Sequence, residues 1–294
     1  MSTEPCAQLL PAREPPRIKR FRLEIANAIP RVPNNRASLL HMRQKRLTDI
    51  LIDYVAWRSR YVGIRPRTIA VDPADRKSRL WSSHLVAINA FLDKARRGED
   101  LTPYLSIQPH TRGYALAANT PGASSEERWS DKDFLLNTMN YHHFHLEEAA
   151  RNGGHGQGKD ELIFAEVNRD TFKLIAVFGH KVFEQGSSER QRLRRLHDTI
   201  AARSAPQDAI VMGSTAIATS GHTLHSVRYA QRCAQLIEET DPKIDAREQV
   251  EGWFGQTGVV APGKPKFEWT FDHLDLGILE KKTGTMFWLQ KGWN

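Results

Sequence analysis

The sequence contains little cysteine, with only Cys6 and Cys233 among 294 residues. The two do not share a Cys-x-x-Cys spacing, so we expect neither a disulfide framework nor a cysteine-ligated zinc site. No stretch approaches the roughly 20 apolar residues that a membrane span requires. Prolines and charges interrupt residues 1–22, which therefore lack the apolar core of a signal peptide. These absences predict a cytoplasmic protein without a membrane partner.

Acidic residues are outnumbered in this chain. There are 42 lysines and arginines against 34 aspartates and glutamates, which gives a formal net charge of +8. A positive balance favours polyanionic partners, which are nucleic acid, acidic proteins or anionic lipid, and is equally compatible with a basic surface that has no dedicated partner. Apolar residues make up 40% of the chain, which is ordinary for a globular protein with a packed core.

The composition changes along the chain and suggests four regions. The first is rich in proline and arginine, the second has helical apolar spacing, the third is rich in loop-forming residues, and the fourth alternates strands with helices. The predicted regions are a basic N-terminal extension at 1–37, a helical region at 38–112, a loop or linker at 113–130 and an α+β domain at 131–294.

Apolar periodicity predicts the main elements. Three- and four-residue spacing indicates helices over 38–64 and 78–97, the second ending at Gly98. A strand is expected over 141–146. The runs Glu161–Val167 and Thr171–Phe178 are separated by three turn-forming residues and predict a hairpin.

Both faces of that hairpin are apolar, which favours a central position in a sheet covered on both sides. Further along, helices are expected over 187–203 and 226–240, and a short strand over 209–213. A last hairpin should join Lys266–Leu279 to Met286–Gln290. The predicted fold class is α+β, with N-terminal helices followed by a mainly antiparallel sheet with flanking helices.

Histidines are concentrated in one part of the sequence. Five of the twelve lie within residues 142–180, and they are His142, His143, His145, His155 and His180. Successive side chains of a strand point to opposite faces, so His143 and His145 should share one face while His142 lies on the other. His180 follows the end of the 171–178 strand and would approach this pair if the strands are neighbours.

Clustered imidazoles suit acid–base catalysis, because imidazole both accepts and donates protons near neutral pH. Cleavage of RNA by its own 2′-hydroxyl needs a base, an acid and a cation that stabilises the phosphorane. His143 or His145 is the candidate base and His180 the candidate acid. The cation could be Lys159 or Arg151, both on the glycine-rich loop 151–160, and Lys159 is the leading candidate.

Metal binding is a second interpretation of the same residues. A His-x-His pair on a strand places two imidazoles on one side, as many zinc and iron sites require. The third ligand would be His180, Glu147 or Glu166. The cluster would then belong to a small-molecule metalloenzyme. The alternative without chemistry is that these histidines simply pack or face solvent.

The helix expected at 187–203 is rich in arginine, which suits phosphate contacts. It also suits a solvated helix face, or a protein that binds nucleic acid without cleaving it. The candidate nucleic-acid-binding residues are Arg151, Arg190, Arg192, Arg194 and Arg195.

The order of features from Gly98 to Phe183 resembles a group of uncharacterised bacterial proteins. The matching segments are "GEDLTPYLS", "DFLLN", "HHFHL", "DELIFAEV" and "FKLIAVFGHKVF". The helix-then-sheet order is similar to that of RelE- and barnase-like ribonuclease toxins. The recurrent polar positions that the resemblance implies are Asn137, His143, His145, Lys159 and His180. Lysine stands at 159 where the group has arginine, which reduces a bidentate phosphate contact to a point charge.

Together these features predict a toxin-type ribonuclease that needs no metal or other cofactor. RNA is favoured over DNA as its substrate, and an antitoxin or a second copy of the chain is the expected protein partner. The alternatives are the non-catalytic nucleic-acid-binding protein and the metalloenzyme.

Overall fold

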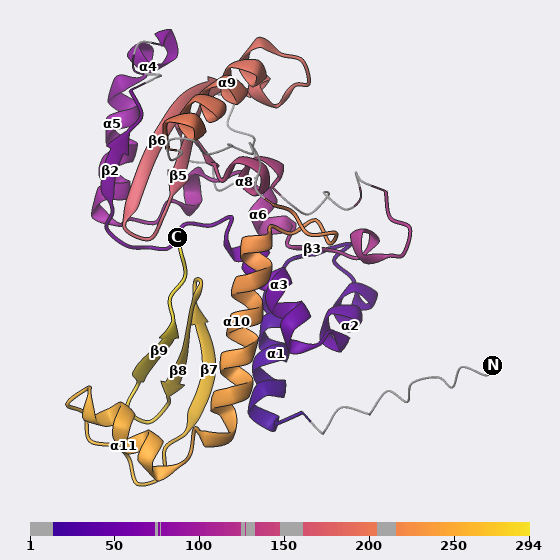
Figure 1. Ribbon diagram of the computed structural model, residues 1–294, viewed down its shortest axis with the longest axis vertical. Helices are drawn as coiled ribbons and strands as arrows, with labels where there is room; N and C mark the ends of the chain where they lie inside the picture. The colour runs from indigo at the N-terminus through magenta and orange to yellow at the C-terminus, as the bar shows by residue number, and fades with distance from the viewer. Residues whose placement is uncertain are drawn as a thin grey trace.

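The computed structural model describes residues 14–73, 76, 78–124, 127, 133–147, 161–204 and 216–294. The protein is α+β, as the sequence predicts, with N-terminal helices followed by sheets and flanking helices. Figure 1 shows a sheet with helices on both sides at one end of the molecule, a helical middle, and a second sheet at the other end. Within the described residues, no helix is both long enough and apolar enough to cross a membrane.

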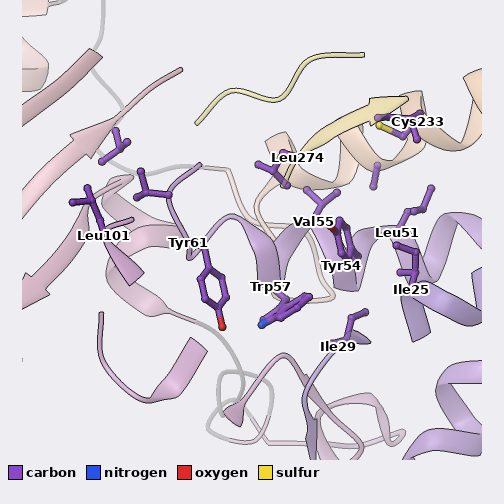
Figure 2. Packing of buried hydrophobic residues seen from close by; sticks show 14 of the residues in the cluster. Ile25, Ile29, Leu51, Tyr54, Val55, Trp57, Tyr61, Leu101, Cys233 and Leu274 are labelled. Atoms are coloured by element: carbon purple, nitrogen blue, oxygen red, sulfur yellow. The ribbon is translucent and has the colours of Figure 1, made fainter. Parts of the chain in front are cut away.

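The helical middle is built from α1 (Pro16–Ala28), α3 (Leu47–Arg58) and α10 (Leu224–Thr240). These helices lie side by side (Figures 1 and 2) and share one apolar core, to which α10 contributes Cys233. Residues 16–28 thus form a packed helix inside the region expected as an extension. Proline is tolerated in the first turn of a helix, and Ile18, Phe21 and Ile25 recur on one buried face.

The single helix expected over 38–64 is two helices, α2 (Arg36–Gln44) and α3. Lys45 between them has an extended backbone. The guanidinium of Arg22, from α1, donates to the carbonyls of Arg43 and Lys45. In a continuous helix those carbonyls would accept hydrogen bonds from backbone amides further along. At the break a side chain from another helix supplies the missing donors.

The central sheet contains β4 (His142–His145), β5 (Glu161–Val167) and β6 (Thr171–Gly179). The predicted hairpin is confirmed: β5 and β6 pair antiparallel and occupy the middle of the order β2-β6-β5-β4. β4 pairs antiparallel with β5 at the edge of the sheet. A strand not expected from the sequence, β2 (Thr68–Val71), adds to β6 in parallel.

Helices cover both faces of this sheet (Figure 1). The expected helix at 78–97 is α4 (Arg79–Ser83) and α5 (Leu85–Arg97), separated by His84. α5 packs Phe91 against Phe144 and Phe172 on one face. On the other face α9 (Ser188–Ser204) covers Phe164 and Phe178, beside α8 (Phe134–Met139).

The far end of the molecule is a three-stranded antiparallel sheet that packs with α11 (Arg247–Gly255). Its strands are β7 (Phe267–Asp272), β8 (Asp275–Glu280) and β9 (Thr285–Gln290). The long strand expected over 266–279 is therefore wrong, because the chain reverses at His273. This residue has a φ of 53°, which strands do not adopt.

The range expected as a loop at 113–130 contains β3 (Tyr114–Ala115), whose residues are buried and pair in parallel with β1 (Arg31–Val32). The strand expected over 209–213 lies outside the described residues. The remaining short elements are η1 (Thr102–Tyr104), α6 (Gln108–Thr111), η2 (Ala117–Asn119), η3 (His180–Phe183) and η4 (Asp241–Lys243).

Candidate functional site

The histidine cluster forms one side of a pocket of about 540 Å³ on the α8 and α9 face of the central sheet. His143 and His145 come from β4, and His180 comes from η3, directly after β6. The strand alternation expected from the sequence is confirmed: His143 and His145 share one face, and His142 and Phe144 are buried on the other. The structure thus brings three of the four candidate catalytic residues together, while Lys159 lies outside the described residues.

His145 and His180 lie close together, with ring centroids 5.4 Å apart. His145 is half-buried, and His180 is exposed. Burial, together with the neighbouring His180 and His143, lowers the pKa of His145 to about 4. At neutral pH His145 is therefore an uncharged imidazole, the form that accepts a proton.

Asp133, which the sequence analysis did not single out, links α8 to the pocket. One carboxylate oxygen accepts a hydrogen bond from the Leu136 amide at 3.1 Å, which caps the N-terminus of α8. The other oxygen lies 3.6 Å from Nδ1 of His143. That separation is longer than a hydrogen bond, and Nδ1 of His143 is buried without a hydrogen-bond partner in the described structure.

The turn that carries His180 is held in place by α9. The amide of Gly179 donates to Glu189 at 3.0 Å, and the hydroxyl of Ser187 donates to the Lys181 carbonyl at 2.6 Å. Nη1 of Arg190 donates to the Phe183 carbonyl at 3.2 Å. These three bonds, two from α9 and one from Ser187 just before it, fix the end of β6, where the His180 ring lies 5.4 Å from that of His145.

The arginines expected to bind nucleic acid have different environments. Arg190 lines the histidine pocket. Arg192 packs its guanidinium 4.5 Å from the centroid of the Phe178 ring, so it is directed toward the sheet. Arg194 and Arg195 are exposed on α9. Arg151 lies outside the described residues.

Two further polar positions have structural contacts away from the pocket. Nε2 of His142 is 2.9 Å from the Ser59 carbonyl, on the opposite face of β4 from His143. Asn137 is buried within α8. Neither residue is among those that line the pocket.

Two phenylalanines at the pocket were also missed by sequence reasoning. Phe134 begins α8 and is 47% exposed, and Phe183 ends η3 and is 41% exposed. The Phe183 ring lies 5.3 Å from the ring of His143 and 6.0 Å from that of His180. In the sequence each phenylalanine lies close to a polar residue of the site, Phe134 to Asp133 and Phe183 to His180. Only the fold shows that both rings lie beside the histidines.

The part of the chain that the structure describes contains no group of three or more histidine, cysteine, aspartate or glutamate side chains arranged to hold a metal ion. The His143 and His145 pair expected as metal ligands therefore has no third ligand among these residues.

Comparison with known proteins gives no relative from which a role could be transferred. No protein-family model matches the chain, and no curated protein or solved structure matches it either.

Proposed function

We propose that this protein is a ribonuclease that cleaves RNA through the attack of its own 2′-hydroxyl. The observation that carries the proposal is the meeting of three imidazoles from β4 and η3 with Arg190 in one pocket. General acid–base catalysis needs two proton-transferring groups on either side of the reacting phosphate, and imidazole performs this near neutral pH. The positive charge of the chain supports a polyanionic substrate.

His145 is the general base in this proposal, because its lowered pKa keeps it in the proton-accepting form. It takes the proton of the 2′-hydroxyl as O2′ forms a bond to phosphorus. The bond from phosphorus to O5′ breaks, and His180 donates a proton to O5′. The products are a 2′,3′-cyclic phosphate and a 5′-hydroxyl end, so protons and bonds balance without another reactant.

Arg190 and His143 stabilise the phosphorane in this proposal. Arg190 reaches the pocket and is fixed through the Phe183 carbonyl, and a guanidinium binds phosphate oxygens well. The carboxylate of Asp133 lies 3.6 Å from Nδ1 of His143. Lys159, the cation expected from the sequence, stays a candidate for the same role.

The test compares cleavage of a 5′-labelled RNA by the wild-type chain and by the double variant His143→Ala, His145→Ala. The wild type should form shorter products that end in a cyclic phosphate, in buffer with EDTA. The double variant should lose at least a hundredfold in rate, since a positioned acid or base contributes roughly 10²- to 10⁴-fold. His225→Ala, an exposed histidine on α10, is the matched control and should cleave normally.

Equal cleavage by the double variant and the wild type would end the proposal. Binding without any cleavage would instead favour the non-catalytic alternative. The exposed Arg194 and Arg195 support that second candidate, because they present positive charge on α9 without needing the pocket. In that case Arg194→Ala with Arg195→Ala should weaken RNA binding and reduce its salt dependence.

A further inference from the structure

Few aromatic side chains are exposed among the described residues, and most of these lie at one place. Among tryptophan, tyrosine and phenylalanine, only Phe134, Phe183 and Trp288 are exposed in the described part of the chain. Phe134 and Phe183 both line the histidine pocket. Trp288 lies on β9 in the other sheet. Exposed apolar side chains that gather at one place commonly mark a binding site, and two of these three rings lie at the pocket that contains His143, His145 and His180.

The two rings come from different elements that meet at the pocket. Phe134 is the first residue of α8, next to Asp133, and Phe183 is the last residue of η3. Phe183 also packs edge-on to His143 and lies 6.4 Å from the buried ring of Phe164. Its ring is thus supported from below by the sheet while 41% of the residue stays open to solvent.

We infer that Phe134 and Phe183 bind unpaired nucleobases, which makes single-stranded RNA the substrate class of this pocket. This inference rests on the proposed function. Proteins that recognise single-stranded RNA stack its splayed bases on aromatic side chains, whereas the bases of a duplex are already stacked on each other. Arg190, in the same pocket, supplies the positive charge for the phosphate between the bases.

The size of the pocket agrees with this substrate class. A cavity of about 540 Å³ lies within the range of pockets that enclose small organic ligands, so it can receive a nucleotide-sized group. A continuous duplex would meet the rims of the pocket with its backbone and keep its bases away from both rings. Base stacking here would also hold the sugar and phosphate of a flexible strand near His145 and His180.

The experiment measures binding without cleavage. A fluorescent 2′-O-methyl RNA decamer lacks the attacking hydroxyl, so its dissociation constant can be measured by anisotropy whether or not the protein is a ribonuclease. The variants are Phe134→Ala and Phe183→Leu in the full chain, at one fixed salt concentration because phosphate contacts are salt-dependent. Leucine at 183 keeps apolar packing on Phe164 and removes the ring.

Each substitution should weaken binding of the single strand by roughly 5- to 150-fold, the usual effect of losing one stacked base. Trp288→Ala removes the exposed ring outside the pocket and should leave binding unchanged. The same decamer paired with its complement should bind more weakly to the wild type and be insensitive to both phenylalanine variants. Thermal unfolding of each variant checks that the fold is intact.

The inference is overturned if the wild type does not bind the single strand, if both variants bind it as the wild type does, or if the duplex binds equally well. The expected binding pattern combined with uncut unmodified RNA would overturn only the proposed ribonuclease and leave a single-strand binding pocket. Cleavage of RNA with no effect of either variant would overturn only the stacking inference.

Discussion

Mild acid should destabilise this protein because two histidines are buried in uncharged form. His142 and His273 are 4% and 7% exposed. Nε2 of His142 meets the Ser59 carbonyl, and Nε2 of His273 meets the side-chain oxygen of Asn294. Both partners are acceptors, so each Nε2 carries the proton. The Nδ1 atoms of both histidines are buried without a hydrogen-bond partner. A second proton, bound at Nδ1, would therefore have no acceptor.

The direction and size of the effect follow from the pKa values. Burial lowers the pKa of His142 to about 4 and that of His273 to about 3. The unfolded chain has histidine pKa values near 6.5, so between these limits it binds more protons than the folded protein. Stability is therefore complete above about pH 6.5 and falls as the pH is lowered. Each buried histidine costs about 1.4 kcal/mol per pH unit, which amounts to about 4 kcal/mol for the two at pH 5.

Urea unfolding followed by tryptophan fluorescence at several pH values between 7.5 and 5.0 measures this loss. In His142→Leu the pH dependence of the free energy of unfolding should be smaller than that of the wild type by roughly a third, because His273 and His145, whose pKa values are also lowered, still contribute. Its stability at pH 7.5 should also change, because the imidazole bond to Ser59 is lost. The Ser59 carbonyl keeps a hydrogen bond from Asn294 at 3.2 Å. His110→Ala, which removes an exposed histidine, serves as the control and should keep the full dependence. Equal slopes in wild type and His142→Leu would refute the reasoning.

Three more outcomes test other parts of the structure. Burial is the main cause of the lowered pKa of His145 and His180 is the next, so in His180→Ala this pKa should rise only in part. An NMR titration of the imidazole signals would detect the change, and an unmoved signal would contradict the pairing. Asp275→Asn should lower the free energy of unfolding in urea by about 3–5 kcal/mol, because the buried carboxylate accepts hydrogen bonds from Arg169 at 2.6 and 2.9 Å and so joins the two sheets. A loss below about 1 kcal/mol would argue against this link. Leu193→Ala should cost about 2–5 kcal/mol, because Leu193 is fully buried between α9 and the central sheet, and an unchanged unfolding midpoint would count against that packing.

Local patterns predicted the part of the fold that depends on neighbours in sequence. The β5–β6 hairpin follows from two apolar runs joined at 168–170, and alternation placed His143 and His145 on one face of β4. The approach of His180 to that face needed one further assumption, that the hairpin pairs beside β4. The structure has that pairing, with His145 opposite Leu162 on β5.

Contacts between distant segments were not readable from local patterns. β2 joins β6 from about a hundred residues earlier, and although it is rich in β-branched residues, four residues are too few for a clear alternating pattern. The break between α2 and α3 depends on Arg22 in another helix. Asp133 has the pattern of an ordinary helix cap, and its second contact, with His143, exists only because the N-terminus of α8 lies next to β4. Side chains that act across the fold are thus harder to predict than the elements that carry them.

Neighbouring histidines on β4 have different roles, because His142 contributes to the stability of the fold and His143 and His145 belong to the proposed catalytic pocket. Alternation directs His142 into the core shared with Ser59 and Asn294, whereas His143 and His145 face the pocket on the opposite side. Protonation of His142 or of His145 opposes folding, because burial lowers both pKa values, but only protonation of His145 also removes a proton acceptor from the pocket. Because these imidazoles lie on opposite faces of one edge strand, replacing His142 should alter the acid stability while leaving the arrangement of the pocket histidines intact. Acid inactivation of the protein would therefore have two physical causes, and a substitution at His142 affects only one of them.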